Sequence, residues 1–223
     1  MTLPRGQAFQ WWRTHEPPTT EQDTMRHLRT PFRIIRENLR AYLVMNAVVY
    51  GALLLGIGAG LLFPDLYAAQ HAALEEAGTA EQIRPLLATP WLFALVILAN
   101  NVLRASLLSI LLPSMVVPFS GIALFAYTTF TIGVIVAPVD GAAARTLVPH
   151  SVTLLVEFQA YVLLMLAAYL LGRAWLRPRA VGADTRRRGY VHGLKQVGWL
   201  SLPALALLVV GAVYEALSVL HLM

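Results

Sequence analysis

Three ionisable side chains lie inside long apolar stretches of the sequence: Arg104, Glu157 and Glu215. A charged side chain inside a membrane is expensive to bury, so it is usually paired or lines a wet cavity. On a helix, Arg104 lies about 20 Å beyond Trp91, where its apolar stretch begins. Glu157 lies about 14 Å beyond Val148, where its own stretch begins. These depths permit an Arg104–Glu157 ion pair near the middle of a bilayer.

Two asparagines extend this pair into a polar seam. Asn100 and Asn101 precede Arg104 by four and three residues, so an α-helix places all three on one face. We expect this face to meet Glu157. Two interpretations are open: Glu157 titrates or binds an ion along a proton or substrate path, or these groups hold the helices together through hydrogen bonds.

A second polar group is expected near the outer ends of the last two apolar stretches. His150, Glu157 and Glu215 could converge there, with His221 beyond them. No H-E-x-x-H or similar fixed spacing links them, and no G-x-S-x-G motif is present. The chain also has no cysteine, which removes thiolate ligands, thiol nucleophiles and disulfides. The sequence therefore predicts no metal, no cofactor and no catalytic residue.

Composition defines the class of protein that holds these side chains. Of 223 residues, 57% are hydrophobic and 13% are charged, where about 45–50% and about 25% are usual. The apolar residues form blocks of the length that a bilayer requires. The net charge of +5 comes from clustered residues and does not suggest a nucleic-acid binder. The chain is predicted to be an integral membrane protein.

The predicted fold is an all-α bundle of five transmembrane helices. An outer loop, 64–90, contains a short acidic helix near 68–77, and a basic inner loop occupies 173–196. Leu112-Pro113-Ser114 is expected to form a tight turn between the second and third helices, because proline interrupts a helix, and Pro118 is expected to kink the third. The five predicted spans are 39–63, 91–111, 115–137, 148–172 and 197–223.

Basic residues assign the two sides of the membrane. Segments 1–40 and 173–196 each carry seven Lys or Arg residues, whereas loops 64–90 and 138–147 carry only Arg84 and Arg145. The positive-inside rule then places the N-terminus in the cytoplasm and, with five spans, the C-terminus outside. The basic inner surface consists of Arg173, Arg177, Arg179, Arg186, Arg187, Arg188 and Lys195.

The first segment, 1–38, is read as a separate basic cytoplasmic region. Its apolar residues recur at helical spacing between arginines, which suits a helix lying on an anionic inner leaflet. A solvated leader that merges into the first span is the other interpretation. Pro31 argues against one continuous helix here.

Small residues mark one face of the first span. Gly56 and Gly60 form a G-x-x-x-G motif that Ala52 extends upstream, and such a face permits close helix approach. Packing within the chain is the default expectation, and dimerisation is the alternative.

Three stretches of this sequence resemble the stage II sporulation protein M family of bacterial and archaeal membrane proteins. Residues 36–60 are similar to the family's first span, and residues 98–107, with Asn100-Asn101-Val-Leu-Arg104, are similar to its N-N-x-R-x-A stretch. Residues 147–172 are similar to its P-H-G-x-x-E helix. Ser151 replaces the glycine of that motif, and Leu154 stands where the family has its glutamate, so this looks like a divergent member.

The resemblance implies a non-enzymatic scaffold in the bacterial cytoplasmic membrane. Such a protein would organise cell-envelope or peptidoglycan-remodelling partners. The basic segments add an anionic inner leaflet as an expected partner, and the G-x-x-x-G face leaves a homo-oligomer open. The alternative is a small transporter, or the membrane subunit of an ATP-driven permease that uses the Arg104–Glu157 seam. A permease subunit would need a separate cytoplasmic ATPase, because the chain has no G-x-x-x-x-G-K-[ST] motif.

Overall fold

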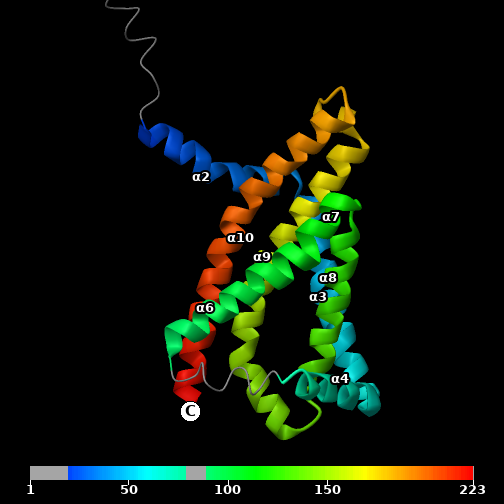
Figure 1. Cartoon of the computed structure of the whole chain (residues 1–223), viewed down its shortest axis with the longest axis vertical. Helices are drawn as coiled ribbons and strands as arrows, with labels where there is room; N and C mark the ends of the chain where they lie inside the picture. The colour runs from blue at the N-terminus through cyan, green and yellow to red at the C-terminus, as the bar shows by residue number, and fades with distance from the viewer. Residues whose placement is uncertain (1–19, 79–88, 223) are drawn as a thin grey trace, which may run out of the picture. The chain divides into compact units, whose positions relative to one another are not determined.

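The computed structural model of the chain describes residues 20–78 and 89–222, and each described element is a helix (Figure 1). The chain divides into two compact units, residues 1–37 and residues 38–223. In the first unit, α2 (Thr20–Glu37) continues through Pro31, contrary to the interruption expected there. Arg33 and Glu37 pair along this helix at 3.9 Å, with both side chains exposed.

The second unit is a bundle in which four helical segments are long and apolar enough to cross a membrane. This indicates a multi-pass membrane protein. The third predicted span, 115–137, corresponds to α8 (Ser120–Ile135), which is apolar but has only 16 residues. The long segments are α3 (Leu39–Leu62), α6 (Pro90–Asn100) continued by η2 (Asn101–Leu111) and α7 (Leu112–Val116), α9 (Gly141–Leu176) and α10 (Arg186–Leu222).

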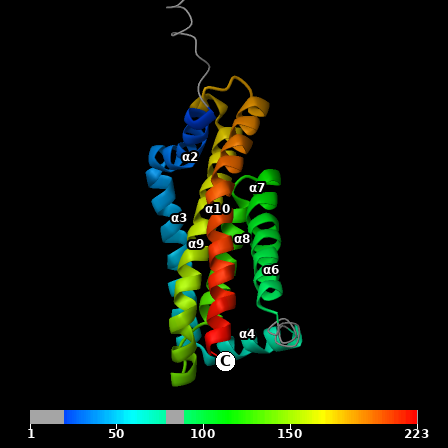
Figure 2. The ribbon, with the colours of Figure 1, turned by 90° about the vertical axis from the view of Figure 1, so that its left-hand side faces the viewer.

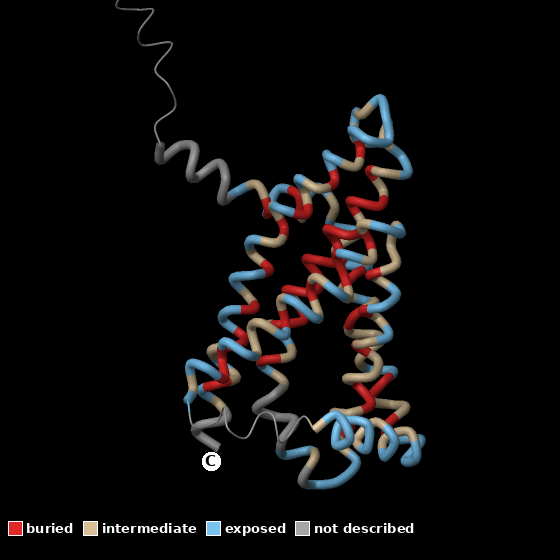
Figure 3. Tube along the Cα trace, viewed as in Figure 1, coloured by how far each residue is buried: buried red, intermediate tan, exposed pale blue. Residues whose placement is uncertain are grey.

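Helix α9 is the centre of the bundle. Its apolar window is 72% buried inside the protein, against 22–33% for the other three long segments. It packs along α10 and also meets α3, η2, α7 and α8. The α6–η2–α7 segment runs obliquely from the C-terminal part of α10 to the start of α8, and buried residues gather where the helices cross (Figures 1, 2 and 3). The outward apolar surfaces are those that a membrane would cover.

The turn between the second and third predicted spans lies later than the sequence indicates. Pro113 lies where η2 passes into α7, and the helix continues through it to Val116. Val117 is extended, as expected before Pro118, and Phe119 is left-handed with φ 70°. The chain therefore reverses at residues 117–119 rather than at 112–114.

Segment η2 has the i→i+5 hydrogen bonding of a π-helix, which usually occurs only as single turns. Serine hydroxyls reinforce it: Ser106 Oγ donates to the Asn101 carbonyl at 2.8 Å, and Ser109 Oγ donates to the Arg104 carbonyl at 2.9 Å. The wider winding changes which residues share a face. Its buried residues are Asn101, Ser106, Ile110 and Leu111.

Helix α4 (Pro64–Glu76) covers the end of the short helix α8. His71 Nε2 lies 3.1 Å from the carbonyl oxygen of Ile135, the last residue of α8, and its ring stacks on Tyr67. The structure confirms a short helix in this loop. It begins earlier than expected and ends before Gly78, which adopts a φ of 64°.

Glycines set the contact between α3 and α8. A Cβ atom at Gly56 would overlap the carbonyl oxygen of Phe130, and one at Gly133 would overlap that of Leu53. At Gly60 a Cβ atom would lie 2.7 Å from the Cβ of Ala137. The G-x-x-x-G face therefore packs within the chain, against α8. Ala52 stays half-exposed on α3.

We expect Gly56→Leu to lower the stability of the protein by about 1–3 kcal/mol or more, because its side chain would force α3 and α8 apart. Gly58→Leu is the matched control, since a Cβ atom at Gly58 meets nothing within 4 Å. Thermal unfolding of both variants in detergent micelles measures the difference. Equal stability of the two variants would contradict this account of the α3–α8 contact.

Candidate functional site

A buried pair joins η2 to α9 in the middle of the bundle. Asn101 Nδ2 donates to Glu157 Oε1 at 2.6 Å, and both residues are at least nine-tenths buried. Gly211 of α10 closes the third side, because a Cβ atom there would lie 2.9 Å from Glu157 Cγ. The carboxyl group is thus enclosed by three helices.

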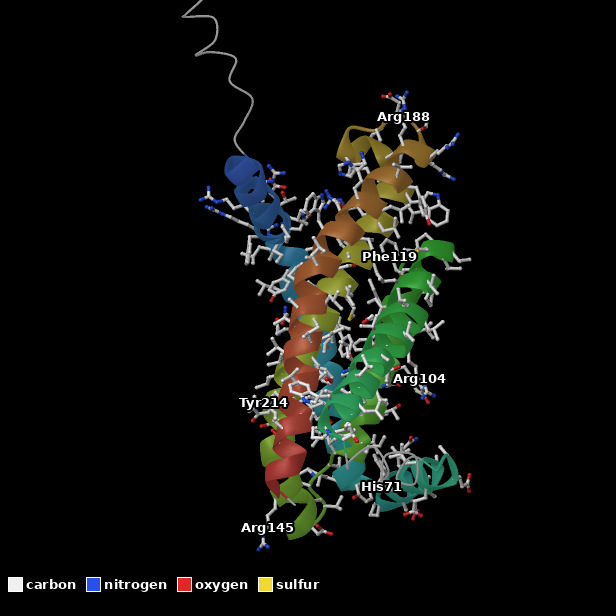
Figure 4. All side chains as sticks on the ribbon, turned by 60° about the vertical axis from the view of Figure 1, so that its left-hand side comes forward. His71, Arg104, Phe119, Arg145, Arg188 and Tyr214 are labelled. Atoms are coloured by element: carbon white, nitrogen blue, oxygen red, sulfur yellow. The ribbon has the colours of Figure 1, made fainter. Side chains whose placement is uncertain are left out.

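Arg104 lies away from this pair. Its side chain is exposed and projects from the outer side of η2, and Asn100 is also exposed (Figure 4). The predicted seam assumed that positions three apart stay on one face, as they do in an α-helix. The wider π winding of η2 separates them, turning Asn101 inward and Arg104 outward. Asn101 is therefore the group that the structure brings to Glu157.

Glu215 is the other acidic residue near this pair. It follows Gly211 by one turn of α10 and is half-buried. The side chains of His150 and His221, predicted to join this group, lie outside the described residues. Among the described residues, no three His, Asp or Glu side chains form a potential metal site.

A second polar cluster, which the sequence analysis missed, joins α3 to α9. Gln159 Nε2 donates to Asn46 Oδ1 at 2.9 Å and to the hydroxyl of Tyr50 at 2.8 Å. The hydroxyl of Tyr42 donates to Gln159 Oε1 at 2.7 Å, and Asn46 Nδ2 donates to the Tyr42 carbonyl at 2.9 Å. The signal was present in the sequence, since Tyr42, Asn46 and Tyr50 are spaced by four residues and so share a helix face.

These two clusters lie on different sides of the same helix. Glu157 and Gln159 are two residues apart, about 200° around α9, so one meets η2 and α10 while the other meets α3. Helix α9 thus carries hydrogen-bonding groups toward both halves of the bundle. This arrangement holds the helices together.

The basic residues of the predicted inner surface gather around the turn between α9 and α10. Arg173 Nη1 donates to Asn38 Oδ1 at 3.3 Å, and Arg188 Nη1 lies 2.8 Å from Asp184 Oδ2. A 3₁₀ helix, η3 (Pro178–Val181), makes part of the turn. Six of these residues are exposed, namely Arg177, Arg179, Arg186, Arg187, Arg188 and Lys195.

Comparison with known proteins finds no matching family model, no similar curated protein and no similar solved structure. The class of protein therefore follows from the four long apolar helices alone: a helical, multi-pass membrane protein. The resemblance to the stage II sporulation protein M family stays a prediction from the quoted residues.

We expect Gln159→Leu to destabilise the protein by about 1–2 kcal/mol, because it leaves the polar groups of α3 unpaired inside the bundle. Gln196→Leu on α10 is the matched control. Among the described residues, Gln196 Oε1 is buried without a hydrogen-bond partner, so the substitution breaks no hydrogen bond to this oxygen. Unfolding midpoints in one detergent compare the two, and a larger loss for Gln196→Leu would overturn the assignment.

Proposed function

We propose that the chain is a non-enzymatic scaffold of the bacterial cytoplasmic membrane that organises partner proteins of the cell envelope. The observation that carries this proposal is the length of the α9–α10 hairpin, formed by α9, η3 and α10. The two long helices have 36 and 37 residues, about 54 and 56 Å, whereas a hydrocarbon core is about 30 Å thick. The hairpin would therefore extend beyond the bilayer and present an ordered, basic surface.

The proposed topology has five crossings, with the N-terminus in the cytoplasm and the C-terminus outside. Fourteen of the seventeen basic residues then lie on the inner side, in segments 1–40 and 173–196. Helix α8 spans about 24 Å and is the short member. Its glycine contact with α3 and the cover of α4 over its outer end support its place as a crossing helix.

The resemblance to the sporulation family supports partners in peptidoglycan remodelling or another part of the envelope machinery. In this proposal the outer surface is α4, whose acidic residues Glu75 and Glu76 are exposed. The inner surface is the basic end of the hairpin. Homo-oligomers and an anionic inner leaflet are the further partners proposed.

Photo-crosslinking at single positions tests this scaffold. A crosslinking amino acid at Arg186 samples the inner surface and one at Glu75 samples the outer surface. One at Leu54, which is 66% exposed on the apolar face of α3, is the control. We expect defined protein adducts in cells from Arg186 or Glu75 that Leu54 does not give. Adducts identical to those of Leu54 would contradict a docking function.

A second candidate function, a transporter or permease subunit, is favoured by the enclosed Asn101–Glu157 pair. It predicts that Glu157→Gln abolishes a pH-dependent flux in proteoliposomes while the protein stays folded. Glu76→Gln, an exposed carboxylate on α4, is the control. Absence of flux from the parent protein would exclude a self-sufficient transporter, and capture of an ATPase at Arg186 would favour a permease subunit.

A further inference from the structure

A hollow of about 600 Å³ opens at the turn of the α9–α10 hairpin. Its wall is formed by the turn and by the first part of α10, and Arg188 lies at this end of the hairpin (Figure 4). Its lining includes the cationic Arg187, Arg188 and Lys195, together with His192 and the apolar Val181 and Val191. The hollow is therefore both basic and partly apolar.

The packing of the hairpin fixes the orientation of this wall. On the inner face of α10, a Cβ atom at Gly189 would overlap the Ala174 carbonyl oxygen, and one at Gly193 would lie 2.8 Å from Leu171. The two helices are thus in close contact on that side. Arg188, His192 and Lys195 follow at intervals of four and three residues, and their side chains are exposed. The cationic stripe is consequently turned away from α9.

The turn that precedes the stripe is locally ordered. Gly182 adopts a φ of 70°, which a residue with a side chain rarely takes, and Thr185 Oγ1 accepts a hydrogen bond from the Arg188 backbone N–H at 3.3 Å. These features fix the path of the backbone at one end of the open hollow.

The charge of the hollow is only partly balanced. Asp184 is the acidic residue of the lining, and it pairs with Arg188 at 2.8 Å. The Asp184 side chain is 80% exposed and the Arg188 side chain is 73% exposed. An exposed pair of this kind contributes little stability, so a stronger anion can displace the carboxylate from Arg188. Arginine forks and a lysine ammonium suit phosphate oxygens, which accept several charge-assisted hydrogen bonds.

We propose that this hollow binds the phosphate of an anionic phospholipid headgroup. Both helices that form it contain a segment long and apolar enough to cross a membrane, and Lys195 lies just before the apolar stretch of α10 that begins at Val197, so the hollow would begin at the level of the headgroups. Val181 and Val191 add the apolar contact that a lipid offers and a free phosphate does not. Basic pockets at the ends of transmembrane helices are known to select anionic lipids. The site deepens the proposed contact with an anionic inner leaflet and rests on that part of the proposed function, but it needs no protein partner.

Native mass spectrometry of the full chain in a neutral detergent tests the proposal, with phosphatidylglycerol as the probe and phosphatidylcholine as the zwitterionic control. We expect selective retention of phosphatidylglycerol, weakened about tenfold in R187Q/R188Q/K195Q. The matched control, R177Q/R179Q/R186Q, removes the same charge from residues that do not line the hollow, and it should retain the lipid. Equal weakening in both triple variants would overturn the site.

Two further measurements distinguish a lipid phosphate from a soluble phosphate as the bound anion. Asp184→Asn frees Arg188, so we expect it to tighten phosphatidylglycerol binding several-fold. Inorganic phosphate at millimolar concentration should compete weakly with the lipid. Full displacement of the lipid by phosphate would identify a soluble phosphate site instead. Binding of a polyglutamate peptide without selective lipid retention would identify a protein-docking surface, and either result would overturn the proposal.

Discussion

Helix α9 brings a carboxyl and an amide into the interior of an apolar bundle, and the neighbouring helices lie where those groups can be hydrogen-bonded. Within a bilayer no water is at hand to replace a missing partner, so each polar side chain must find one in the protein. Glu157 meets Asn101 on one side of α9, and Gln159 meets three polar residues of α3 on another. These contacts fix the rotation of α9 about its axis and the heights of η2 and α3 beside it.

Close backbone contacts at glycines also hold the helices together. Gly56 and Gly133 let α3 and α8 touch, while Gly189 and Gly193 do the same for α9 and α10. Membrane helices gain little from burying apolar side chains against one another, because lipid is equally apolar, so close packing is the main source of attraction. The bundle is thus two closely packed helix pairs, joined by the oblique α6–η2–α7 segment and by the polar contacts of α9.

The sequence predicted features that depend on length, hydropathy and small residues. Four long apolar helices and the packing face at Gly56 and Gly60 are of this kind, because a bilayer imposes both a length and a need for close contact. The same reasoning failed at Arg104, whose face was derived from α-helical geometry in a segment that is a π-helix. It also failed at Pro113, where a turn was predicted and the helix instead continues to Val116.

The hydrogen-bond partners of Gln159 could not be predicted from the sequence, for a different reason. A single amide within an apolar run gives no indication of which helix it will meet, and its three partners lie more than a hundred residues away. The spacing of Tyr42, Asn46 and Tyr50 marks a polar face on α3 but does not identify the side chain that it receives. The sequence analysis concentrated on charged residues because their burial is costly. In the structure, the hydrogen-bonded amide of Gln159 forms a larger network than the Asn101–Glu157 pair.

The π-helix also bears on how the length of this chain can vary. A segment with i→i+5 bonding holds more residues in each turn than the α-helices that flank it. A relative lacking a residue between positions 101 and 111 could therefore keep both ends of the helix in place by reverting to α-helical winding. An alignment gap inside this transmembrane segment would then mark a change of winding and not the loss of a span.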